Sequence, residues 1–116
     1  MNTKTEPTYR VAIYMSGPLE QIKQECRRFV RRHPQCVTVK PSTFIYCGGE
    51  EEGAEIGLLN YPRFPQSEQE IYTYAECLAV ALVEATHQNS ALIVSPTRTE
   101  WYSKRPIEQP SNQSEP

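Results

Sequence analysis

The loop Asn60–Pro65 carries the side chains best suited to chemistry in this sequence, with Arg63 between Pro62 and Phe64 and preceded by Tyr61. Proline fixes its own φ and restricts the residue before it, so a loop with two prolines holds its side chains in set directions. A guanidinium flanked by aromatic rings can stack on a planar ligand and pair with a phosphate or carboxylate. The loop therefore predicts a site for a planar or anionic ligand. The alternative is that the rings plug the edge of the core and Arg63 neutralises nearby glutamates.

Polar and aromatic residues elsewhere in the chain could complete this site. The predicted ligand-binding residues are Arg63, Tyr61, Phe64, Thr43, Tyr46, Arg98 and Trp101. Base stacking together with phosphate pairing suits a nucleotide-like small molecule. The competing hypothesis is a protein-protein interaction adaptor or inhibitor, in which the same aromatic and arginine residues form an interface hot spot.

Catalysis receives less support from the residue types. All fourteen acidic residues are Glu, so mechanisms that require Asp, such as an aspartyl nucleophile, are excluded. The candidates for an acid, base or nucleophile are His33, His87, Cys47, Glu55, Tyr46 and Tyr102. No Ser-His-acid spacing, phosphate-cradling glycine loop or HExxH motif is present. The sequence thus favours a non-catalytic binding protein over a small metal-independent enzyme.

Metal and cofactor sites are not expected. The four cysteines, Cys26, Cys36, Cys47 and Cys77, form no C-x-x-C pair, and closed zinc sites usually have such short ligand spacing. No apolar run is long enough to cross a bilayer, and no secretory leader precedes the first strand. These features predict a cytoplasmic protein with no membrane partner, whose cysteines are reduced and mostly packed in the core.

The net charge of −2 hides an uneven distribution. Residues 1–40 hold eight Lys or Arg against three Glu, whereas residues 41–116 hold four against eleven. This separation allows attraction between copies of the chain or a basic face on an acidic body. The acidic total makes nucleic acid an unlikely partner.

The hydrophobic pattern of the first half predicts a strand, a helix and a hairpin. Residues 9–16 alternate with period two, and residues 19–33 place apolar side chains on one helical stripe. Strand character resumes over 36–40, is interrupted at Pro41 and continues over 43–47. The Gly48-Gly49 pair is expected to open a reversal that Gly53 closes, after which 54–59 forms the second strand of the hairpin.

The second half predicts a helix and two strands. Ser67 and Glu70 form a capping box, which is the firmest helix start in the sequence. The apolar run Ala91–Val94 is typical of a strand buried on both faces, and Thr97–Tyr102 alternates as an edge strand would.

The order of elements predicts an α+β, ferredoxin-like βαββαβ fold with an antiparallel four-stranded sheet, two helices on one face and a further C-terminal edge strand. The expected organisation is a flexible segment 1–8, a single domain 9–102 and a disordered polar tail 103–116. The face of the sheet without helices would be too apolar to remain wet. We therefore expect a homodimer or higher homo-oligomer, or a ligand bound there.

A compact sandwich of this size and element order, with a short polar tail, resembles the small ferredoxin-like accessory proteins of tailed phages. Some members of that group sequester nucleotide signals of host defence. The resemblance covers the fold pattern and assigns no residues. It implies an anti-defence binding protein that acts in the host cytoplasm.

Overall fold

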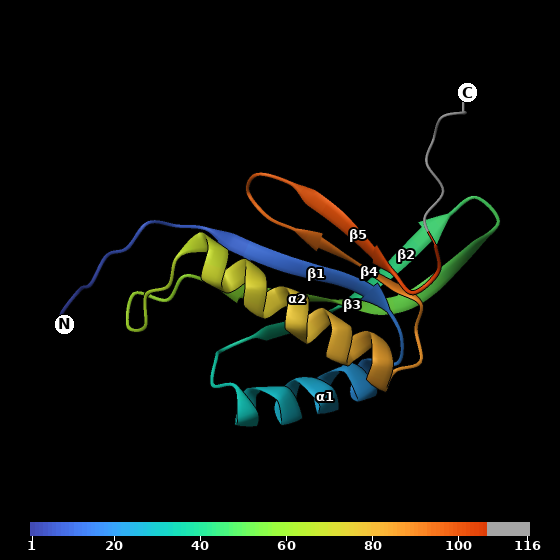
Figure 1. Ribbon diagram of the computed structural model, residues 1–116, viewed down its shortest axis with the longest axis horizontal. Helices are drawn as coiled ribbons and strands as arrows, with labels where there is room; N and C mark the ends of the chain where they lie inside the picture. Colours follow the sequence, from blue (N-terminus) through green and yellow to red (C-terminus); the bar gives the residue numbers. More distant parts are fainter. Residues whose placement is uncertain (107–116) are drawn as a thin grey trace.

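A computed structural model describes residues 1–106 and shows five strands and two helices. The elements are β1 (Arg10–Ser16), α1 (Leu19–Arg32), β2 (Thr38–Tyr46), β3 (Gly49–Leu59), α2 (Glu68–Ala85), β4 (Ser90–Val94) and β5 (Thr99–Ser103). They form one sheet in the order β2-β3-β1-β4-β5, in which every neighbouring pair is antiparallel (Figure 1). The predicted ferredoxin-like arrangement is confirmed, and β5 is the additional edge strand.

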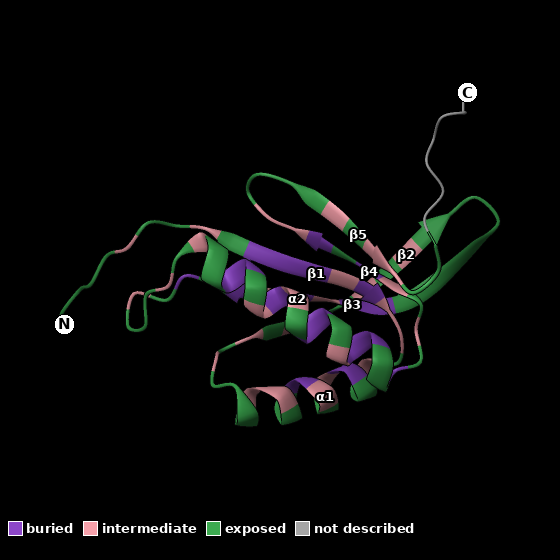
Figure 2. Ribbon diagram, in the orientation of Figure 1, coloured by how far each residue is buried: buried purple, intermediate pink, exposed green. Residues whose placement is uncertain are grey.

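Both helices lie against the same face of the sheet (Figure 1). The core fills the space between the helices and the sheet. It consists of alternate residues of the central strands and the inner stripes of the helices (Figure 2). In β1, Val11 and Ile13 are fully buried, and Ile56 in β3 and Ile93 in β4 lie in the same layer. Period-two alternation therefore places one side of each strand under the helices.

Helix α2 begins as the capping box requires. The Glu70 amide donates to the Ser67 hydroxyl at 3.0 Å, and the Ser67 amide donates to the Glu70 carboxylate at 2.8 Å. The two groups satisfy backbone donors that have no partner inside the helix. This boundary is the one that the sequence predicts most firmly.

The sheet face turned away from α1 and α2, which we call the open face, corrects the prediction for β4. Leu92 is 39% exposed, although Ala91 and Ile93 beside it are buried. The expectation of a strand buried on both faces is wrong because helices cover only one face. Trp101, opposite Leu92 on β5, is also exposed on the open face.

The β2–β3 hairpin turns earlier than predicted. Tyr46 pairs with Gly49, so the reversal occupies only Cys47 and Gly48, and Gly48 has a φ of 94°. A two-residue turn needs positive φ, which glycine adopts without steric cost. Residues 50–53, expected in the turn, belong to β3, and the end of the hairpin extends beyond the helices (Figure 1).

Pro41 does not interrupt β2, which runs through it with Pro41 paired to Ala54. Proline is accepted because β2 is an edge strand of the sheet. The cysteine prediction also needs correction, since Cys26 is buried but Cys36, Cys47 and Cys77 are exposed.

The predicted tail 103–116 begins at the last residue of β5, and residues 107–116 lie outside the described part of the chain. The proposed domain limits therefore stay a prediction. Neither helix in the described residues combines the length and apolar character that crossing a membrane would require.

Candidate functional site

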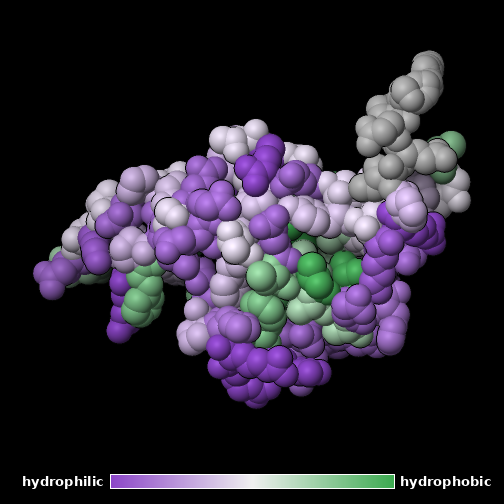
Figure 3. All heavy atoms as spheres, in the orientation of Figure 1, coloured by the Kyte–Doolittle hydropathy of each residue, from purple (hydrophilic) through white to green (hydrophobic). Residues whose placement is uncertain are grey.

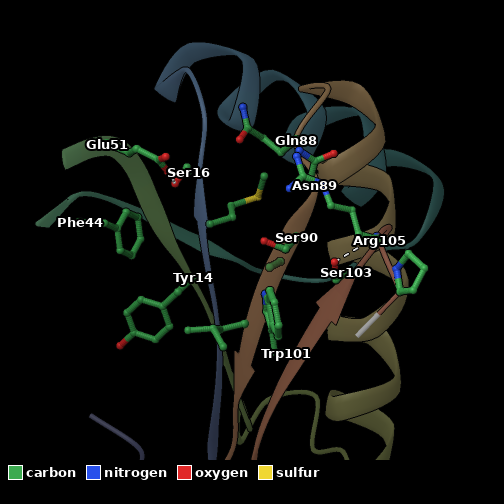
Figure 4. A pocket seen from close by; sticks show the side chains of 14 residues that line it. Tyr14, Ser16, Phe44, Glu51, Gln88, Asn89, Ser90, Trp101, Ser103 and Arg105 are labelled. Carbon is green, nitrogen blue, oxygen red and sulfur yellow. Dashed lines mark hydrogen bonds between the residues drawn. The ribbon is translucent and has the colours of Figure 1, made fainter. Parts of the chain in front are cut away.

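A hollow of about 540 Å³ opens on the open face, where β1 ends and β3 and β4 begin. Its walls carry three aromatic rings, a carboxylate, two amides and a guanidinium: Tyr14, Phe44, Trp101, Glu51, Gln88, Asn89 and Arg105. Figure 4 shows Glu51 beside Ser16 on one side of this hollow and Ser103 with Arg105 on the other. We call it the open-face hollow.

Glu51 is the acidic group of the open-face hollow. Its carboxylate accepts hydrogen bonds from the Ser16 hydroxyl and, at 3.0 Å, from the Tyr46 hydroxyl. The bond from Ser16, followed by the bond from Tyr46, holds the pKa of Glu51 below its usual value. The same contact with Glu51 raises the pKa of Tyr46. Glu51 is therefore ionised at neutral pH, and its hydroxyl partners fix its position.

Strand register places Glu51 in this wall. It pairs with Phe44 across the hairpin, and Gly53, two residues further along β3, pairs with both Ser42 and Ser16. A Cβ atom on Gly53 would lie 2.7 Å from the Ser16 Cα and 2.8 Å from the Phe44 ring. Glycine is thus required for the close approach of the Phe44 ring and β1 at this point.

The opposite wall comes from the connection between α2 and β4 and from β5. His87 has a φ of 58°, a left-handed conformation that turns the chain sharply after the helix. The Gln88 amide then donates to the Val83 carbonyl at 3.0 Å, and the Lys104 amide donates to the Asn89 carbonyl at 2.8 Å. These backbone bonds position residues 88 and 89 beside β5, and the side chains of both residues line the open-face hollow.

The structure does not bring the seven predicted ligand-binding residues together. Trp101 lines the open-face hollow, and Tyr46 reaches it through Glu51. The Thr43 hydroxyl donates to Glu52 at 2.9 Å, on the opposite side of the hairpin from Glu51. The Arg98 guanidinium lies 4.0 Å from the centre of the Tyr72 ring and pairs with Glu100 at 3.1 Å, outside the open-face hollow.

Tyr61, Arg63 and Phe64 line a separate hollow of about 630 Å³, beside the segment that follows α1. The Phe64 amide donates to the Tyr61 carbonyl at 2.9 Å, which closes a turn with Pro62 inside it. The Arg63 guanidinium stands 5.3 Å from the centre of the Phe64 ring, and the Tyr61 hydroxyl lies 3.1 Å from the Cys36 thiol. Arg63 therefore lies over one of the two rings that flank it in sequence, and a ligand role for this loop stays a prediction.

Replacing Arg63 by Ala tests that role. If the loop binds an anionic planar ligand, a nucleotide that raises the melting temperature of the wild type should not raise that of Arg63→Ala. Saturation at a hundred times Kd corresponds to about 2.7 kcal/mol of stabilisation. Arg28→Ala, on the exposed side of α1, is the matched control for loss of a surface cation. An unchanged thermal shift in Arg63→Ala would remove Arg63 from any such site.

Of the six catalytic candidates from the sequence, only Tyr46 forms a hydrogen bond with Glu51 in the described part of the chain. His33 packs against Phe29 at the end of α1, with the ring centres 4.8 Å apart and the ring planes tilted by 44°. The Tyr102 hydroxyl donates to Glu76 at 2.6 Å and so ties β5 to α2. No group of three potential metal ligands forms within residues 1–106.

Sequence reasoning missed Glu51, Ser16 and Phe44. The signal was the hairpin turn: a two-residue turn at 47–48 puts Glu51 on the same face as Tyr14. A turn predicted over residues 48–53 would instead place Glu51 and its acidic neighbours in a solvated loop.

No known sequence family and no curated protein matches this chain in sequence. Two solved structures share its fold. A phage SAM lyase in complex with S-methyl-5′-thioadenosine superposes with a TM-score of 0.67 at 12% identity, covering 93% of this chain and 98% of that one. A phage SAM lyase in the apo state gives 0.56 at 9% identity, covering 87% and 91%. The likeness is one of fold and carries over no residue roles.

These structures contradict the prediction of a non-catalytic binding protein, together with its adaptor alternative, because each is the structure of a SAM lyase, which is an enzyme. The aromatic and polar residues had indicated ligand binding, but such residues line catalytic pockets as well. The predicted resemblance to small phage proteins is confirmed in this coarse form.

Proposed function

We propose that this protein is an enzyme that cleaves a carbon–sulfur bond of a sulfonium nucleoside of the S-adenosylmethionine type in the open-face hollow. One observation carries the proposal: an ionised Glu51, held by Ser16 and Tyr46, stands in an aromatic-lined hollow of a fold shared with SAM lyases. A hollow of about 540 Å³ is within the range of about 300–1,000 Å³ that small-molecule sites occupy.

The lining fits the nucleoside half of such a substrate. A purine ring can stack on the exposed Trp101 or Phe44 ring, and ribose hydroxyls can donate to the Glu51 carboxylate. The amides of Gln88 and Asn89 offer both donors and acceptors to the base. Each part of the nucleoside therefore meets a group of matching chemistry.

The reaction neutralises two opposite charges of the substrate, the sulfonium cation and the carboxylate anion. An oxygen of the substrate's own carboxylate attacks the γ-carbon of the amino acid chain, the C–S bond breaks, and sulfur takes its electron pair. The products are a neutral thioether, 5′-methylthioadenosine, and a four-carbon amino-lactone. The charge of the sulfonium is partly neutralised in the transition state. An aromatic lining solvates charge less well than water, so it favours the transition state over the charged substrate. The lowered pKa makes Glu51 a weak base, so we assign it a binding role.

The test is direct product detection. Purified protein incubated with S-adenosylmethionine should release 5′-methylthioadenosine and the lactone, both identified by mass spectrometry. Boiled protein is the control for spontaneous breakdown of the substrate. Rates equal to that control would refute the proposed activity. An unsaturated amino acid in place of the lactone would show elimination instead of displacement.

A shift in the pH profile is expected for Ser16→Ala. The Ser16 hydroxyl lowers the pKa of Glu51, so binding that needs the ionised carboxylate is lost only as pH falls through that lowered pKa. Removing the donor raises the pKa toward its usual value, and the acid limb of kcat/KM should move to higher pH. Thr43→Ala removes the equivalent hydroxyl from Glu52 and should leave the acid limb in place.

The open face also supports the proposal that the protein is a homo-oligomer. Leu92, Trp101 and Leu59 expose apolar side chains there, with exposed fractions of 39%, 54% and 37%. Leu92 and Trp101 also line the open-face hollow, so the contact between copies would lie beside the substrate. Light scattering after size exclusion should show more than one copy, and Leu92→Glu should shift the mass to that of a monomer. A monomeric wild type at micromolar concentration would contradict this.

From the likeness to phage enzymes, we place the activity in the host cytoplasm, where consuming a nucleoside cofactor would act against defence.

A further inference from the structure

Three charged side chains from three strands meet on the open face, outside the open-face hollow. The Glu55 carboxylate of β3 lies 3.5 Å from the Arg10 guanidinium of β1 and 3.8 Å from the Lys40 ammonium of β2. The Glu55 side chain is only 14% exposed, whereas those of Arg10 and Lys40 are 60% and 65% exposed. We call these three residues the Glu55 cluster.

The Glu55 cluster adjoins the open-face hollow through Tyr14. Tyr14 lines that hollow and pairs directly with Glu55 across β1 and β3. It also lines a second hollow of about 330 Å³, together with Arg10. Between Tyr14 and Arg10 the paired residues are Ala12, which also lines this second hollow, and Gly57, which lies beside the Thr38 hydroxyl. A ligand can thus extend from one hollow to the cluster along the open face.

The spacing matches a nucleoside that carries a short side chain. Glu51 and Glu55 are four residues apart on one face of β3, which is about 13 Å at roughly 3.3 Å per residue. Hydrogen bonds of about 3 Å at each end leave roughly 7 Å between the bonded groups of the ligand. Ribose, sulfonium and a two- or three-carbon chain fill that interval.

The charges match an α-amino acid. Both ion pairs in the Glu55 cluster are longer than a charge-assisted hydrogen bond, about 2.7–2.9 Å, so the guanidinium keeps free donors. An α-ammonium group can take the place of Lys40 against Glu55, while Arg10 holds one oxygen of the carboxylate. The second oxygen stays free to attack the γ-carbon. A substrate without the amino acid would leave these charges unused.

We propose that the Glu55 cluster is the subsite for the α-amino acid end of the substrate and selects sulfonium nucleosides that carry that group. This inference rests on the proposed function, because it assumes that the nucleoside occupies the open-face hollow. Arg10 and Glu55 are specificity-determining residues in this arrangement, and Lys40 neutralises Glu55 while the site is empty.

Calorimetry with two non-reacting ligands tests the subsite. S-Adenosylhomocysteine carries the amino acid, and 5′-methylthioadenosine lacks it. Wild-type protein should bind the first at least tenfold more tightly than the second. Arg10→Gln and Glu55→Gln should each weaken binding of S-adenosylhomocysteine at least tenfold and leave that of 5′-methylthioadenosine within twofold. Glu52→Gln, on the other side of β3, controls for loss of a strand glutamate and should change neither value.

The outcomes separate the two claims. Equal weakening of both ligands would show that the Glu55 cluster only supports the sheet, and no weakening of either would place the amino acid elsewhere. A wild type that binds 5′-methylthioadenosine as tightly as S-adenosylhomocysteine overturns the subsite alone. A wild type that binds neither ligand and forms no product overturns the proposed function, and the subsite with it.

Discussion

Replacing Glu51 by Gln is expected to lower kcat/KM for S-adenosylmethionine by about 10- to 100-fold, the usual effect of losing a hydrogen bond to a charged group. The amide has nearly the same shape, but it lacks the charge and one of the two acceptor oxygens that meet Ser16 and Tyr46. Steady-state assay of 5′-methylthioadenosine release measures the effect. KM should rise by a larger factor than kcat falls, because Glu51 binds the ribose both before and during the reaction.

Glu52→Gln is the matched control for this prediction. Glu52 is the next residue of β3 and is also exposed, and its carboxylate accepts a hydrogen bond from Thr43 outside the open-face hollow. Its replacement should leave kcat/KM within about twofold of wild type, since surface substitutions usually have small effects. Equal losses in the two variants would mean that general negative charge on the hairpin, not the placed carboxylate, assists the reaction.

Replacing Gly53 by Ala is expected to destabilise the protein by about 3 kcal/mol, at the upper end for an overpacked site. The added Cβ would meet the Met15 carbonyl oxygen, the Ser16 Cα at 2.7 Å and the Phe44 ring at 2.8 Å. Two of these three atoms belong to the backbone of the central strand β1, which cannot move aside without breaking sheet pairing. Differential scanning calorimetry should show a fall of about 10 °C or more in Tm.

Gly49→Ala provides the comparison for Gly53→Ala. A Cβ on Gly49 would lie 3.3 Å from the exposed Tyr46 ring, which can shift by the few tenths of an ångström required. The expected change in Tm is therefore a few degrees at most. If Gly53→Ala melts as Gly49→Ala does, the close approach of Phe44 and β1 at residue 53 is not required for the fold.

Apolar surface is exposed on the helix side of the molecule as well as on the open face. Figure 3 shows hydrophobic side chains gathered over part of one side of the molecule, with hydrophilic residues around them. Val80 on the outer side of α2 is 59% exposed, although the inner stripe of the helix is fully buried. The helices are thus covered on one side only, and the open face carries the aromatic residues of the candidate site.

Local sequence signals determined most of the secondary structure. The alternation in β1, the helical stripe of α1 and the Ser67–Glu70 capping box each depend on residues close together in the chain, so their physics is readable without tertiary contacts. The element order then specified the ferredoxin-like arrangement, because short connections and buried faces leave few alternatives.

Tertiary structure alone decided which side chains meet. The turn at 47–48 set the register that places Glu51 opposite Phe44, and pairing of β1 with β3 brought Ser16 to the same carboxylate. A shift of one residue in that register would turn Glu51 to the other face. The loop Asn60–Pro65 lines a different hollow, since nothing in its own sequence specifies what lies next to it. Sequence by itself fixed the types of residue and the elements that carry them, whereas their assembly into a site depended on long-range strand pairing.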